Sequence, residues 1–128
     1  MKLLFDTHAA IWAVHDENRF SITLRSLIND PTTILTFSAI SIAEIAIKRA
    51  HDRDDFPFEP TIIRTALLDA GYEEVVLTGA HALELRTLPP IHRDPFDRML
   101  VAQTRTEGST LLTADVTLQK YEVPTIAL

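Results

Sequence analysis

The sequence predicts an α/β domain with a mostly parallel sheet. Short apolar or β-branched segments alternate along the chain with segments whose apolar residues recur at helical spacing, as in strands joined by crossover helices. Two of the apolar segments, residues 3–5 and 111–113, run into the carboxylates of Asp6 and Asp115. Because open α/β sheets bind ligands outside the carboxyl ends of their strands, both acids are candidates for a functional site.

Composition places the chain among globular proteins of one domain, which we expect to span residues 1–128. It has 128 residues, of which 46% are hydrophobic and 23% charged, and it has no Cys. Disulfides and thiolate metal sites are therefore excluded, which fits a reducing compartment. No apolar run approaches the roughly 20 residues of a membrane span, so we expect a cytoplasmic protein without membrane association.

The net charge argues against a simple nucleic-acid-binding module. Twelve Lys and Arg residues against eighteen Asp and Glu residues give −6, the wrong sign for holding nucleic acid through the overall field. A metal-dependent nuclease is still allowed, because cations inside a carboxylate cluster reverse the sign locally.

Each element has a local signal. Residues 2–5 are a short apolar run that fits a strand buried on both faces. Ser21 is a plausible helix N-cap, Gly71 ends a helix, and Asp94-Pro95 opens the most clearly signalled helix. The remaining predicted strands are residues 33–37, 73–77, 109–113 and 123–128. The predicted helices are residues 8–14, 21–29, 41–50, 61–70, 78–88, 95–107 and 115–121.

Asp6 and Glu44 each fit two roles. Asp6 can cap the helix that follows it, or it can be a ligand at the sheet edge. Glu44 fits a capping box with Ser41 and an i, i+4 pair with Lys48. Its apolar neighbours, which include Ile42, Ile45 and Ala46, equally suit an embedded functional acid pointing along the same edge as Asp6.

For two later acids, Asp94 and Asp97, the capping role and the site role can be told apart more clearly. Asp94 is explained as the N-cap of the helix that begins at Pro95. Asp97 can be an acid favoured by the helix dipole, but it precedes the apolar residues 99–102, which favours an inward-facing group. Asp115 resembles Asp6, since capping and site roles both fit it.

Four carboxylates at one edge would repel each other unless a cation lay between them. Oxygen ligands without thiolates suit Mg²⁺ or Mn²⁺. The five His residues show no paired ligand spacing, so most of them are expected to be surface or packing residues. Gly-rich phosphate loops and a Ser nucleophile elbow are absent from the sequence.

Four segments together resemble the PIN-domain ribonucleases, and most closely the VapC toxins of bacterial toxin–antitoxin pairs. They are Leu4-Phe5-Asp6-Thr7-His8-Ala9, residues 38–48 around Glu44, His92-Arg93-Asp94-Pro95-Phe96-Asp97-Arg98, and Leu112-Thr113-Ala114-Asp115. The resemblance implies a three-layer α/β/α sandwich with about five strands. It also implies an acidic quartet of Asp6, Glu44, Asp97 and Asp115 that binds Mg²⁺ or Mn²⁺, with Asp94 and Thr113 as supporting residues. Homodimers and a cognate VapB-like antitoxin, whose tail enters the acidic site through a basic side chain, are implied as well.

The expected activity is metal-assisted hydrolysis of an RNA phosphodiester. Arg93, Arg98, Lys48 and Arg49 are candidates for holding the RNA. A haloacid-dehalogenase-type phosphatase would need Asp where His8 stands, and a receiver domain would need Lys where Ala114 stands. The non-enzymatic alternative is a catalytically silent binding partner whose acids serve as helix caps.

Overall fold

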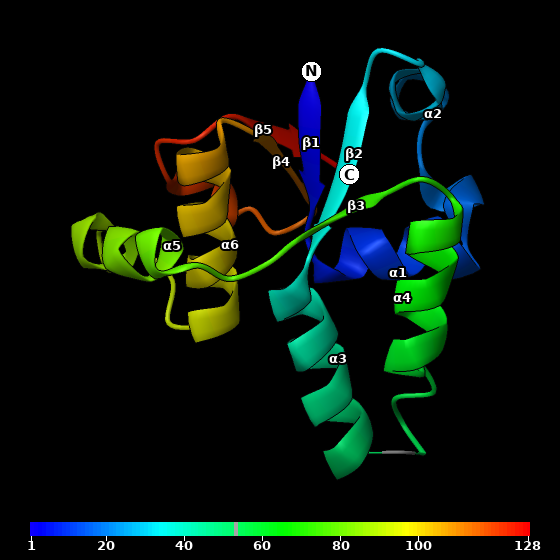
Figure 1. The fold of residues 1–128 in the computed structure, drawn as a ribbon, viewed down its shortest axis with the longest axis horizontal. Helices are drawn as coiled ribbons and strands as arrows, with labels where there is room; N and C mark the ends of the chain where they lie inside the picture. Colours follow the sequence, from blue (N-terminus) through cyan, green and yellow to red (C-terminus); the bar gives the residue numbers. More distant parts are fainter. Residues whose placement is uncertain (53) are drawn as a thin grey trace.

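The computed structural model describes residues 1–52 and 54–128 and contains one five-stranded sheet (Figure 1). Its strands are β1 (Lys2–Phe5), β2 (Ile34–Ser38), β3 (Glu73–Val75), β4 (Thr110–Thr113) and β5 (Thr125–Ala127). They lie in the order β3-β2-β1-β4-β5, and every neighbouring pair is parallel. The predicted α/β class with a parallel sheet of about five strands is confirmed.

Helices cover both faces of the sheet, as expected for a three-layer sandwich. The α-helices are α1 (Thr7–His15), α2 (Ile22–Asn29), α3 (Ala39–His51), α4 (Pro60–Asp69), α5 (Gly79–Glu84) and α6 (Pro95–Glu107), and the 3₁₀ turns are η1 (Glu17–Arg19), η2 (Leu85–Thr87) and η3 (Leu118–Lys120). In Figure 1, α5 and α6 lie on one side of the sheet, α1 and α4 lie on the other, and α3 extends beyond its lower edge. None of the helices in the described residues has the length and apolar character needed to span a bilayer.

The central strand is buried on both faces. Leu3 and Phe5 belong to the apolar core on the side of α1 and α4, whereas Leu4 belongs to the core formed with α6. Adjacent strand β4 divides in the same way, with Leu112 in the first core and Leu111 in the second. This alternation follows from the period of two along a strand and explains why the run is apolar without a polar face.

The strand order reverses between β1 and β4. The chain proceeds from β1 to β2 and β3 on one side, then returns to β4 and β5 on the other. Phe5 pairs with Phe37 of β2 and with Leu112 of β4, so these three strands end level with one another. Such a reversal is where open α/β sheets bind their ligands.

Two local predictions are wrong. The capping-box alternative for Ser41 and Glu44 is wrong, because α3 begins at Ala39 and its N-cap is Ser38, whose hydroxyl accepts the Ile40 N–H. The helix predicted over residues 115–121 is reduced to the single 3₁₀ turn η3. The intervening residues are held by a turn in which the Asp115 side chain competes for the backbone.

Substitution of Gly108 tests whether a left-handed residue is needed to end α6 before β4. Its φ of 64° lies in the left-handed region, and an added Cβ would meet no atom within 4 Å. We expect Gly108→Ala to lower the free energy of unfolding by about 1 kcal/mol through backbone strain alone, as measured by urea denaturation. Gly79→Ala is the matched control, because that site is equally open but has no positive φ. Equal losses in both variants would contradict the explanation.

Candidate active site

A pocket of about 350 Å³ at the carboxyl edge of the sheet brings together four acids that the sequence singled out: Asp6, Glu44, Asp97 and Asp115. They come from four different parts of the fold, namely the end of β1, α3, α6 and the turn after β4. The rest of the lining consists of Thr7, His8, Trp12, Lys48, Asp94 and Ala114.

Asp6 both caps α1 and faces the pocket. Its Oδ1 accepts the Ala9 N–H at 2.8 Å, and the residue is only 5% exposed. Burial raises the pKa of Asp6, although the Thr113 hydroxyl and the Ala9 N–H act against this rise. The two roles that the sequence left open are therefore combined in one side chain.

Glu44 lies in the second turn of α3 and is buried. Its Oε1 accepts the Thr7 hydroxyl at 2.7 Å, and its Oε2 lies 2.9 Å from Lys48 Nζ, the predicted i, i+4 pair. Thr7 Oγ1 also lies 3.0 Å from the Ser41 hydroxyl. Because Thr7 follows Asp6 directly, these bonds fix Glu44 against the end of β1.

Asp94 and Asp97 begin α6. Asp94 is the N-cap, with Oδ1 accepting the Phe96 N–H at 2.8 Å, which confirms the capping prediction. Burial is the main cause that raises the pKa of Asp97 from 3.8 to about 7. The carboxylates of Asp94, Glu44 and Asp115 add to this rise. His92 acts against this rise, but burial and the neighbouring carboxylates together make the charged form of Asp97 unfavourable in this pocket.

Asp115 is held by the turn that follows β4. Its N–H donates to Thr113 Oγ1 at 3.0 Å, and its Oδ1 accepts the Thr117 N–H at 2.8 Å. Burial acts to raise the pKa of Asp115, but the Thr117 N–H and His92 outweigh it and lower the pKa. Since the Thr113 hydroxyl also acts on Asp6, Thr113 links the ends of β1 and β4.

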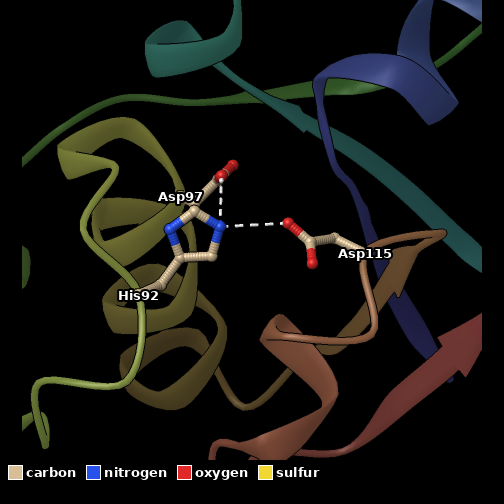
Figure 2. A group of neighbouring side chains, drawn as sticks. All are labelled: His92, Asp97 and Asp115. Carbon is tan, nitrogen blue, oxygen red and sulfur yellow. Dashed lines mark hydrogen bonds and ion pairs between the residues drawn. The ribbon is translucent and has the colours of Figure 1, made fainter.

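Sequence reasoning missed His92. Figure 2 shows its imidazole between Asp97 and Asp115, with Nε2 at 3.3 Å from Asp97 Oδ2 and 3.0 Å from Asp115 Oδ2. One ligand atom of each residue lies within 4.8 Å of the other two. The sequence gives no local signal for this contact, because His92 and Asp115 are 23 residues apart along the chain.

Two of the candidate RNA-holding cations point elsewhere. Arg98 donates to the Pro89 carbonyl at 2.9 Å and to the Tyr121 hydroxyl at 3.2 Å, and it does not line the pocket. Arg49 donates to the Phe56 carbonyl at 3.2 Å. Both side chains hold backbone segments in place.

The other two candidates lie at the pocket or beside it. Lys48 lines the acidic pocket and also an adjoining hollow of about 420 Å³. Arg93 lines only this second hollow, together with the apolar side chains of Ile47, Pro95 and Phe96. The two hollows share Glu44, Lys48 and Asp94 as their common wall.

Known proteins with the same architecture include members of one family. The PIN domain family profile matches residues 3–124. VapBC2 from Rickettsia felis, solved bound to a DNA fragment from their promoter, is similar with a TM-score of 0.74 at 12% identity, over 100% of this chain and 99% of that one. VapBC-1 from nontypeable Haemophilus influenzae has a TM-score of 0.65 at 18% identity, over 99% and 98% of the two chains. At these identities the two structures support the fold alone. Curated protein sequences give no significant match.

Two substitutions of Asp6 separate its role as the helix cap from the effect of its buried charge. Asp6→Asn keeps an oxygen for the Ala9 N–H but removes a buried negative charge, so we expect a higher melting temperature in EDTA. Asp6→Ala also loses the cap and should be less stable than Asp6→Asn by about 1 kcal/mol. Calorimetry of the three proteins measures both effects. A melting temperature for Asp6→Asn several degrees below wild type would mean that the charged form is structurally required.

The raised pKa of Asp97 predicts that the stability of the metal-free protein depends on pH. Its pKa is about 7 in the folded state against an ordinary value of 3.8, so the folded protein binds this proton more tightly than the unfolded chain. Stability should therefore fall as pH rises from about 4 to 7, by at most ~1.4 kcal/mol per pH unit for this group. Urea unfolding in EDTA between pH 5 and pH 8 measures the slope.

Asp97→Asn should flatten this slope because it removes the titrating group. Asp69→Asn, at an exposed position on α4, is the matched control and should keep the wild-type slope. Identical slopes in Asp97→Asn and wild type would refute the assignment.

Proposed function

The chain belongs to the PIN-domain family, and from this premise we propose that it is a metal-dependent endoribonuclease of the VapC toxin type. The observation that carries the proposal is the convergence of Asp6, Glu44, Asp97 and Asp115 on one pocket at the reversal of strand order. RNA is the proposed substrate, and residues 1–128 are proposed to act as one nuclease domain.

The donor set of the pocket fits a hard divalent cation. The carboxylates offer oxygen ligands, and burial together with neighbouring carboxylates raises the pKa of Asp97 to about 7. Mg²⁺ or Mn²⁺ suits such ligands, and Asp6, Asp97 and Asp115 would hold it. When bound, the cation lowers the pKa of a water molecule and offsets negative charge on the phosphate.

The chain's own residues then orient the reactants. Glu44 is fixed by Thr7 and Lys48, so its carboxylate can accept a hydrogen bond from the attacking water. The N–H of Thr117 fixes Asp115, and the N–H of Ala9 fixes Asp6. Carboxylates held in this way need little reorganisation during the reaction, which is the main source of electrostatic catalysis.

The RNA is proposed to run from the acidic pocket into the adjoining hollow. Lys48 borders both, and Arg93 stands in the second one. These two cations would contact the phosphates that flank the cleaved bond. Phe96 and Ile47 provide apolar surface for a neighbouring base.

The similar structures support the proposed partner. Because both are VapBC structures, we propose a cognate VapB-like antitoxin. A homodimeric toxin and a cytoplasmic location, both expected from the sequence, complete the proposal. An antitoxin tail with a basic side chain would be attracted to the acidic pocket, because the pocket contains a buried excess of negative charge.

The direct test is cleavage of end-labelled single-stranded RNAs with Mg²⁺ or Mn²⁺ and with EDTA. We expect cleavage only with metal, and a loss of roughly 100-fold or more in Asp6→Asn and Asp97→Asn, because each removes a charged ligand. Asp69→Asn should cleave like wild type.

Undiminished cleavage in EDTA, or in either ligand variant, would contradict the proposal. A folded wild type that cleaves no RNA in a panel of varied sequence and structure would favour the catalytically silent binding partner instead.

A further inference from the structure

We propose that His92 is a positioning residue of the metal site. Its Nε2–H holds Asp97 and Asp115 together and orients the Asp115 carboxylate, while the imidazole itself does not bind the metal. This inference rests on the proposed function and adds a residue that the acidic quartet does not include.

The hydrogen bonds of His92 determine its tautomer. Nδ1 accepts the backbone N–H of Asp94 at 3.0 Å. Because a neutral imidazole accepts at one ring nitrogen and donates at the other, the proton is on Nε2. Nε2 faces Asp115 Oδ2 at 3.0 Å and Asp97 Oδ2 at 3.3 Å. A metal ligand needs a lone pair at this nitrogen, so the tautomer assigns Nε2 as a donor.

This donor lies between two carboxylates that repel each other. Asp115 and Asp97 converge on the same nitrogen (Figure 2). The N–H is hydrogen-bonded to Asp115 and its positive end also lies near Asp97 Oδ2, which lowers the cost of holding the two carboxylates close. It also completes the fixation of Asp115, whose Oδ1 accepts the Thr117 N–H while Oδ2 faces His92. Both oxygens of that carboxylate are then oriented before a cation arrives.

The loop that carries His92 is itself anchored. The His92 N–H donates to the hydroxyl of the buried Tyr121 at 2.9 Å. The same hydroxyl also accepts a hydrogen bond from the Arg98 guanidinium at 3.2 Å. Arg98 reaches the Pro89 carbonyl in the same loop. The Tyr121 hydroxyl thus fixes the backbone of residue 92, and the Asp94 N–H fixes its imidazole. Outer partners held in this way typically tune metal ligands.

The test compares Mn²⁺ binding, by titration calorimetry, in wild type, His92→Ala and His92→Gln. Glutamine keeps an N–H donor, but its amide nitrogen has no lone pair to offer a metal. We expect His92→Ala to weaken Mn²⁺ binding about 10- to 100-fold and His92→Gln to restore most of the affinity. His51→Ala, at an exposed histidine that ends α3, is the matched control and should bind like wild type. Circular dichroism in EDTA verifies that each variant is folded.

The outcomes separate this inference from the proposed function. Equal losses in His92→Ala and His92→Gln would make His92 a ligand, and unchanged or tighter binding in His92→Ala would make it dispensable or a competitor. Either result overturns the positioning role while leaving the metal site intact. A wild type that binds no Mn²⁺, or an Asp97→Asn variant that binds it as wild type does, overturns both.

Discussion

Parallel pairing of β1 between β2 and β4 is the constraint on which the pocket depends. The register sets Phe5 level with Phe37 and with Leu112, so three strands end at one edge. Each strand end is followed by a helix start or a tight turn, where backbone N–H groups are free to hold side-chain oxygens. A carboxylate placed there is fixed by the backbone and still faces the space between the strands. Convergence of the acids is therefore a consequence of sheet order.

Charge balance in the pocket is uneven. Backbone N–H groups hold Asp6 and Asp115, and Lys48 pairs with Glu44. The pKa of Asp97 rises to about 7, first because the side chain is buried and then because of neighbouring carboxylates, and His92 offsets only part of this rise. A bound cation would favour the charged form of Asp97 and so relieve this unfavourable energy.

Local signals in the sequence predicted the elements better than they predicted the roles of single side chains. Asp94 was identified as an N-cap because Pro95 follows it, and a cap depends only on adjacent residues. Glu44 was given a capping alternative because the pattern fits, but Ser38 starts that helix one turn earlier. The role of His92 depends on a loop folding back over the turn after β4, and no spacing along the chain encodes that. The convergence of the four acids could be expected from parallel strand order, whereas their individual hydrogen bonds could not.

The hydrogen bonds of the pocket fall into two halves, and one residue has a partner at each. In the first half, Thr7 ties the end of β1 to Glu44. In the second, His92 faces both Asp97 and Asp115. Thr113 connects the halves, because its hydroxyl acts on Asp6 and receives the N–H of Asp115, and this threonine is fully buried at the end of β4. A hydroxyl can donate to one partner while accepting from the other, whereas an apolar side chain of the same shape could do neither. Interactions at the ends of the two central strands therefore depend on the same side chain.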